Sequence, residues 1–353
     1  MAHYEERLQA DLERIKTKLR QLGVGVQEAL NKATASVLTR DAELATDTIL
    51  GDLPINRRYR EIDHLCHVFV ARHFPSAGHL RFISAVLRLN KTLERIGDYA
   101  ETISRAALQL ADNPPPQISE DIRMMSQHAA KILGRSLRAF DEQNAELARG
   151  TLEFAGEYAT TYDRVFADMI DEGERRTRPV PELFSLLAIF NRFERVIHQS
   201  KNICEQTLFV TTGATKLDKT FDILFVDDSN TGASLLAEHY SRKNFPGRGT
   251  YQSAGWSAGK AVDPVYVRYA VEKGLDLRQA IPRSFDAIKH AISDVDIIVD
   301  LSGNARSNIP KIPFHTLLLS WPLENRDQPD EVCQQLAPKL NGLMRRLRGD
   351  EEA

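Results

Sequence analysis

A helix predicted in the first half of the chain carries three carboxylates on one face. Glu94, Asp98 and Glu101 follow one another at intervals of four and three residues, and Asn90 lies one turn before them. Side chains at these intervals are neighbours on a helix surface. Because like charges so close together destabilise a helix, the pattern requires a cationic partner.

A second acidic group follows β-strands predicted in the last third of the chain. Asp227 and Asp228 come directly after the run 222–226, and Asp300 lies in the run 295–301. The carboxyl ends of parallel strands meet at one edge of a sheet, so these carboxylates are expected to converge. Two unit charges about 4 Å apart interact by about 4 kcal/mol at an effective dielectric of about 20, which disfavours an added anion.

Three interpretations of this second group stay open. The first is a decayed pocket that serves only to maintain the fold or to contact a partner. The second is a site where carboxylates hold a divalent cation such as Mg²⁺. The third is a receiver domain of a response regulator, whose acidic pair and phosphoacceptor the three aspartates resemble. Against the receiver, 72 residues separate Asp228 from Asp300, about one βα unit too many.

Apolar periodicity predicts a helical bundle for residues 1–212. The seam of one bundle helix recurs in steps of four and three residues, at Leu8, Leu12, Ile15, Leu19 and Leu22. A further helix is expected over about 80–108, after the break at Pro75.

This helical region is duplicated. The run Ala-Glu-Leu-Ala at 42–45 recurs at 145–148, and residues 89–103 align with residues 189–203. Prolines at 114–116 separate the two copies, because proline cannot continue a helix. Two similar bundles in tandem are therefore expected to share a core.

After residue 212, short apolar runs alternate with predicted helices, which is typical of a doubly wound parallel sheet. The expected strands cover 222–226, 249–253, 295–301 and 315–319, and the expected helices cover 233–243, 264–273 and 286–291.

Composition excludes several classes of protein. The chain has 353 residues and a formal net charge of −3, without the excess positive charge of a nucleic-acid binder. Apolar runs such as 186–190 are far shorter than the roughly 20 residues of a membrane span, and residues 1–22 are too charged for a signal peptide. A cytoplasmic protein is expected. The three cysteines form no CxxC pair, which argues against disulfides and thiolate zinc sites.

The run His79-Leu80-Arg81 and the later run ERIGDYA at 94–100 resemble segments of the PhoU proteins, regulators of phosphate uptake. The similarity covers about residues 5–213 and implies two three-helix repeats. In that family a Glu-x-x-x-Asp motif binds clusters of metal ions, often iron. Carried over, it implies iron, manganese or zinc at Glu94 and Asp98, with Glu101 beside them; otherwise these residues are solvated or paired.

The second repeat departs from this motif. Its corresponding residues are Glu194 and His198, which can still ligate a transition metal. Lys201, however, stands in the place of Glu101 and would repel a cation. An exposed or hydrogen-bonded histidine is the alternative interpretation of His198.

The PhoU resemblance implies a function without catalysis. Proteins of that family contact the ATPase of the high-affinity phosphate transporter and the phosphate-sensing histidine kinase, so that ample phosphate silences the uptake genes. The resemblance also implies a homodimer that meets membranes only through such complexes. A role beside a sodium-phosphate cotransporter is the alternative.

The run VDDSNTGAS at 226–234 begins a second resemblance. With the runs SAG, DP, GLD and SGNAR that follow it in order, it is similar to the low-molecular-weight protein tyrosine phosphatase and arsenate reductase family over about residues 221–345. That family requires a Cys-x5-Arg loop, in which a thiolate attacks and an arginine grips the phosphoryl oxygens.

The residues of this chemistry are missing. Asp227 stands at the nucleophile position and Ala233 at the arginine position, and Ser302 and Ile309 replace the further cysteines of arsenate reductases. The general acid corresponds to Asn325. The resemblance therefore implies the fold of a phosphatase without its reaction.

We predict tandem all-α three-helix bundles followed by an α/β domain with a four-stranded parallel sheet. The expected boundaries are 1–112 and 117–212 for the repeats, 213–220 for a linker and 221–353 for the phosphatase-like domain. The predicted function is non-catalytic regulation of phosphate uptake, with the degenerate domain as sensor or docking element. The alternatives are a phosphatase or arsenate reductase with a regulatory helical domain, and a receiver-like signalling domain on a PhoU module.

Overall fold

The structure is a computed structural model that describes residues 2–349, with gaps at 157–158, 176–177, 214–219, 289–291, 293–294, 311 and 314–315. The chain divides into two compact units, Met1–Lys216 and Leu217–Ala353. Most of the linker predicted at 213–220 lies outside the described residues. Among the helices in the described part of the chain, none has the length and apolar character that a membrane span requires.

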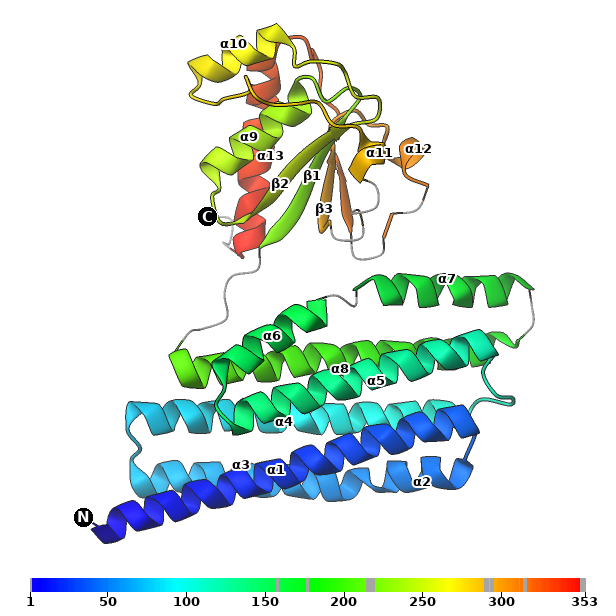
Figure 1. The fold of residues 1–353 in the computed structure, drawn as a ribbon, viewed down its shortest axis with the longest axis vertical. Helices are drawn as coiled ribbons and strands as arrows, with labels where there is room; N and C mark the ends of the chain where they lie inside the picture. The colour runs from blue at the N-terminus through cyan, green and yellow to red at the C-terminus, as the bar shows by residue number, and fades with distance from the viewer. Residues whose placement is uncertain are drawn as a thin grey trace. The chain divides into compact units, whose positions relative to one another are not determined.

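The first unit is a helical bundle in which α4 and α8 lie side by side (Figure 1). Its helices within the described residues are α1 (Ala2–Thr39), α2 (Ala42–Leu50), α3 (Asp52–His73), α4 (Ala77–Ala107), α5 (Pro116–Asp141), α6 (Ala145–Gly156), α7 (Ala159–Arg175) and α8 (Val180–Thr212). Helices α1–α4 and α5–α8 repeat the same order, as the duplication predicts.

The middle helix of the first repeat is broken, which apolar periodicity did not predict. Helices α2 and α3 meet at Gly51, whose N–H donates to the carbonyl group of Asp47. Pro54, in the first turn of α3, has no N–H with which to continue the hydrogen bonds of α2. The break places Asp52 at the start of α3.

One apolar core runs through both repeats. Helix α1 contributes its predicted seam, and α4 contributes Leu89, Leu93 and Ile96, which are 0% exposed. Helix α8 adds Phe193 and Val196 to the same core. Because burying each large apolar side chain contributes about 1.5–3 kcal/mol, the two repeats stabilise each other as halves of a single bundle.

The second unit contains a four-stranded sheet in the order β2-β1-β3-β4, with all neighbouring strands parallel. This confirms the predicted fold class. Residues 289–291 and 315, at the ends of an expected helix and an expected strand, lie outside the described residues. The elements are β1 (Phe221–Asp227), α9 (Ala233–Asn244), β2 (Gly249–Gly255), α10 (Pro264–Glu272), α11 (Phe285–Ile288), β3 (Ile297–Asp300), α12 (Ala305–Asn308), β4 (Leu317–Ser320) and α13 (Pro329–Arg348).

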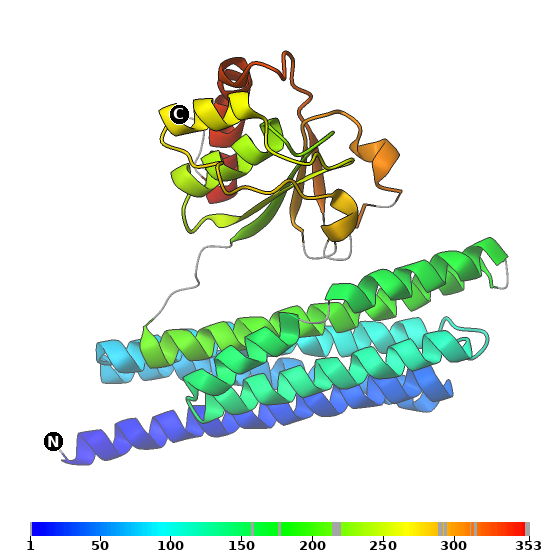
Figure 2. The same ribbon diagram turned by 45° about the horizontal axis from the view of Figure 1, so that its top comes forward.

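Helices cover both faces of this sheet (Figures 1 and 2). Ile223 and Phe225 of β1 pack with α9, α10 and α13, whereas Leu224 and Val226 pack on the other face with α11 and α12. The alternation follows from the two-residue period of a strand. Strands β1 and β3 are parallel neighbours, so the loops that follow them leave the same edge of the sheet. Both strands end in an aspartate.

The cysteines differ in accessibility. Cys66 and Cys204 are buried, and burial raises the pKa of each thiol to about 12, whereas Cys333 is partly exposed. We expect only Cys333 to react with a disulfide reagent near pH 8 in the folded protein, and all three thiols after unfolding. Titration with and without guanidinium checks this. Reaction of two thiols in the folded protein would contradict the burial.

Candidate functional site

The first repeat contains a carboxylate cluster formed by Asp52, Asp98 and Glu101. Oxygen atoms from the three side chains all lie within 4.8 Å of one another. Asp98 and Glu101 belong to the predicted acidic face of α4, but Asp52 comes from the first turn of α3. Glu94, one turn before Asp98, forms an ion pair of 2.9 Å with Lys91.

Gly97 allows α3 and α4 to approach at this cluster. A Cβ atom at Gly97 would lie 3.1 Å from Cγ2 of Ile55 and 3.6 Å from Oδ1 of Asp52. Any side chain there would press on α3. The glycine within the ERIGD run therefore positions Asp52 against Asp98.

The cluster has an excess of negative charge. Burial, reinforced by Glu94, Asp52 and Glu101, raises the pKa of Asp98 to about 6. Burial and the same two glutamates also raise the pKa of Asp52. Oδ1 of Asp52 is buried without a hydrogen-bond partner, while Oδ2 accepts from the side-chain amide of Asn56. A cation among the three carboxylates would relieve this repulsion.

The donor set is made of oxygen, which suits manganese, magnesium or calcium, whereas soft thiolates and imidazoles favour zinc and copper. Glu101 is also paired with Arg105, at 2.6 Å. Asn90, on the same predicted face, is not part of the cluster, because it is buried and donates to the carbonyl group of Tyr59. The residues present therefore fit a hard divalent cation.

The second repeat does not reproduce this cluster. Nε2 of His198 lies 4.0 Å from Oε1 of Glu194, and burial lowers the pKa of His198. When the match between 42–45 and 145–148 is continued without a gap, Asp52 aligns with Ala155, which is buried. Lys201 stands in place of Glu101. Of the four acidic positions of the first repeat, Asp52, Glu94, Asp98 and Glu101, the second repeat therefore keeps an acid only at Glu194.

In the second unit, the Asp227 carboxylate occupies the centre of the loop that follows β1. Its Oδ1 accepts hydrogen bonds from the backbone N–H groups of Ser229, at 3.2 Å, and Asn230, at 2.6 Å. Its Oδ2 accepts from the N–H of Ser234, at 2.9 Å. Asp227 is only 5% exposed. Backbone N–H groups that converge in this way form a cradle for an anion, and here the protein's own carboxylate fills it.

Asn230 holds this loop in shape. Its φ of 53° lies in the left-handed region, which few residues other than glycine and asparagine adopt. The side-chain nitrogen donates to the hydroxyl groups of Ser234 and Ser253, and Oδ1 accepts from the N–H of Arg283. Glu238, which is buried and paired with Arg283 at 2.7 Å, accepts from Ser253. The loop is thus supported by a buried polar network.

Tyr266 packs against the same loop. A Cβ atom at Gly232 would lie 2.6 Å from the Tyr266 ring, so only glycine fits there. The phenol donates to the carbonyl group of Arg326, at 2.6 Å, and burial, with the nearby Asp227, raises its pKa.

Asp300 and Asp228 also have partners. Oδ1 of Asp300 accepts from the N–H groups of Ser302 and Gly303, and Oδ2 accepts from the N–H of Ala305, at 2.8 Å. Asp228 pairs with Arg326 at 2.5 Å. The repulsion expected among the three aspartates is thus offset by the protein itself. A magnesium ion at this edge stays a prediction, and it would compete with these donors.

The degenerate positions have structural contacts of their own. Ala233 is buried at the start of α9, and Ile309 is buried in the core beside α11 and α12. The Ser302 hydroxyl donates to Asp300 and accepts from the indole N–H of Trp256. The Asn325 amide donates to Glu331 of α13, at 2.6 Å.

Sequence reasoning missed two contributors. Asp52 follows Gly51 at a helix start, but no periodicity indicates which residue of α3 faces α4. Arg326 carries no signal in the sequence, yet its guanidinium reaches both Asp228 and the carbonyl group of Ser302.

Comparison with known proteins identifies both units. The PhoU domain model matches residues 19–107 and again residues 122–207, and the model of low molecular weight phosphotyrosine protein phosphatase matches residues 222–318. The match to the phosphatase model includes the loop of Asp227.

Individual relatives agree with the first match. A phosphate-specific transport system accessory protein PhoU of Serratia marcescens is 26% identical over 211 residues, which are 60% of this chain and 87% of that protein. The crystal structure of PhoU from Pseudomonas aeruginosa has a TM-score of 0.56 and 26% identity, and the match covers 58% of this chain and 99% of that one. The chain therefore consists of two PhoU domain repeats followed by a low molecular weight phosphotyrosine protein phosphatase domain.

Proposed function

We propose that this protein is a cytoplasmic regulator of phosphate uptake that acts by binding other proteins. Its partners in this proposal are the ATPase of a phosphate transporter and a phosphate-sensing histidine kinase, and the chain acts as a homodimer. The observation that carries the proposal is the pair of PhoU repeats, because relatives over the same residues are accessory proteins of phosphate-specific transport systems.

A metal ion is part of the proposal. Asp52, Asp98 and Glu101 would hold it, with Glu94 beside them, and of iron, manganese and zinc it is manganese that fits an all-carboxylate set best. The ion would neutralise the cluster and fix α3 against α4, which makes that surface of the first repeat a rigid one for a partner to recognise.

The phosphatase-like unit is proposed to be catalytically inactive and to serve as a docking or sensing element. Asp227 cannot act as a thiolate, and its carboxylate already accepts from the three N–H groups that an oxyanion would need. The nearby guanidinium of Arg326 is neutralised by Asp228. An incoming dianion would therefore meet one buried carboxylate and no uncompensated cation in this loop.

Deleting the gene in the source organism tests the regulatory role. With ample phosphate, the deletion strain should express its phosphate-uptake genes as if starved, and the full chain should silence them again. Silencing should fail with Asp98→Asn and persist with His198→Ala, its counterpart in the second repeat. Unchanged transcript levels in the deletion strain would overturn the proposal.

Capture of partners provides a direct measurement. The tagged chain, recovered from phosphate-replete cells, should bring down the transporter ATPase and the histidine kinase. Recovery of neither protein, with the chain itself intact, would contradict the proposed contacts.

A further inference from the structure

A hollow of about 430 Å³ lies along the line where α4 meets α8. The two helices run antiparallel, because Arg88 contacts Gln206 while Tyr99 contacts Arg192. Both views show them side by side (Figures 1 and 2). We call this hollow the α4–α8 groove. Its polar lining is formed by Arg88, Lys91, Thr92, Arg95, Gln199, Asn202 and Gln206.

The side-chain amides of this groove leave hydrogen-bond donors available. Oε1 of Gln206 accepts from Arg88, and Oε1 of Gln199 accepts from Asn202, each at 3.3 Å. With both carbonyl oxygens engaged, the NH₂ groups of the two glutamines remain as donors. Arginine side chains have no acceptor at all.

The groove is also positively charged. Its lining contains no carboxylate, and Arg95 makes no hydrogen bond or ion pair with any described residue. Of the three cations in the lining, Arg88, Lys91 and Arg95, Lys91 alone pairs with a described acidic residue, Glu94. A hollow with donors, free positive charge and no acidic lining is suited to an oxyanion.

The shape and lining narrow the class of anion. Arg88 and Arg95 are seven residues apart on one helix, which is about 10.5 Å of axial rise, so one small anion spans the pair poorly. Leu87 is the single apolar residue of the lining, which leaves no anchor pocket for a peptide. Nearby aromatic rings are already covered: Arg88 lies over Phe209 and Lys91 over Tyr59, so no ring is offered for stacking a base.

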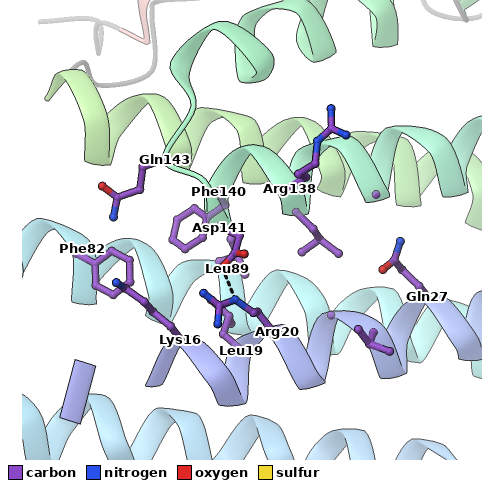
Figure 3. Close-up of a pocket in the computed structure, with 14 residues that line it drawn as sticks. Lys16, Leu19, Arg20, Gln27, Phe82, Leu89, Arg138, Phe140, Asp141 and Gln143 are labelled. Carbon is purple, nitrogen blue, oxygen red and sulfur yellow. Dashed lines mark hydrogen bonds and ion pairs between the residues drawn. The ribbon is translucent and has the colours of Figure 1, made fainter. Parts of the chain in front are cut away.

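A second cavity among the described residues of the bundle lacks these properties. It measures about 310 Å³ and lies between α1 and α5, with apolar walls that include Leu19, Phe82 and Phe140. Figure 3 shows the contact between Arg20 and Asp141 as a dashed line. This ion pair measures 2.5 Å, and Lys16 is paired with Glu13. Its charges are therefore balanced within the protein.

We propose that the α4–α8 groove binds a linear inorganic oxyanion that carries several charges, a short polyphosphate. The guanidinium groups of Arg88 and Arg95 hold phosphoryl groups towards the two ends of the anion, and the amides of Gln199 and Gln206 donate to the oxygens between them. This anion-binding site goes beyond the proposed regulatory role. It does not depend on that role, because binding of the anion is measured on the purified chain without its partners.

Titration calorimetry on the full chain, freed of metal beforehand, tests the site. Tripolyphosphate should bind saturably, and orthophosphate and sulfate should bind at least tenfold more weakly at equal ionic strength. Arg95→Gln should raise the Kd for tripolyphosphate about tenfold, the usual effect of losing one charge-assisted contact. Because Arg95 is exposed and unpaired, its replacement leaves the fold intact.

Arg123→Gln is the matched control, since Arg123 is an exposed arginine of α5 that pairs with Glu120 away from the groove. It should leave the Kd unchanged. The proposal is overturned if tripolyphosphate does not bind, or if the two variants weaken binding equally. A hexaglutamate peptide that binds more tightly than tripolyphosphate would also overturn it and assign the groove to an acidic protein segment.

Discussion

Asp227→Ala should destabilise the phosphatase-like unit by about 3–5 kcal/mol, and phosphate or sulfate should restore part of that loss. The substitution leaves the N–H groups of Ser229, Asn230 and Ser234 buried without acceptors, and each such group costs about 1–3 kcal/mol. The vacated cradle then fits an oxyanion, which stabilises the folded state by mass action. No aryl phosphatase activity should appear, because neither the thiolate nor the arginine is restored.

Intrinsic fluorescence measures this effect selectively, because both tryptophans, Trp256 and Trp321, belong to the second unit. The thermal midpoint of the variant should fall by roughly 10 °C or more and rise again with added sulfate. Asp228→Ala is the control, since it removes an exposed ion pair worth at most about 1 kcal/mol. Equal midpoints for the two variants, or equal stabilisation of the wild type by sulfate, would show that Asp227 does not fill the cradle.

Asp98→Asn should weaken manganese binding about 100-fold, whereas His198→Ala should leave it unchanged. An oxygen of Asp98 lies within 4.8 Å of oxygens of both Asp52 and Glu101, and an amide is a poor replacement for an anionic ligand. Asp52→Asn, on the other helix, should have a similar effect, which a site formed by α4 alone would not show.

Loss of manganese binding by Asp98→Asn will not reflect unfolding of the protein. Burial and neighbouring acids raise the pKa of Asp98 from 3.8 to about 6, so the ionised side chain destabilises the metal-free protein above that pH. Asp98→Asn removes this cost and should raise the melting temperature of metal-free protein at pH 7. Calorimetry and elemental analysis of the three variants decide the question. Equal loss from Asp98→Asn and His198→Ala would place the ion elsewhere.

Elements with strong periodicity were predictable. The seam of α1 and the buried positions Leu89, Leu93 and Ile96 of α4 follow the helical period, and the duplication allowed a second helical bundle to be predicted from the first. Strand β1 was predicted from a short β-branched run and extends one residue further at each end, as Phe221–Asp227. Local signals sufficed here because burial of one face dictates the residue pattern.

The sites were predictable only in part, because their geometry depends on contacts between elements. Asp98 and Glu101 could be placed on one face, but Asp52 enters through the packing of α3 at Gly97. Likewise, the aspartates at the strand ends were expected to repel one another, since the sequence does not reveal which backbone N–H groups point inward. The loop conformation set by Asn230 decides that Asp227 is bonded to three of them.

The unequal repeats have a consequence for stoichiometry. A duplicated bundle with two intact carboxylate clusters would offer equivalent surfaces at two places on each chain. Here Ala155, His198 and Lys201 stand where the first repeat has Asp52, Asp98 and Glu101, so within the part of the chain that the structure describes the cluster belongs to the first repeat alone. A partner that recognises the carboxylate cluster therefore binds each chain once and in one orientation.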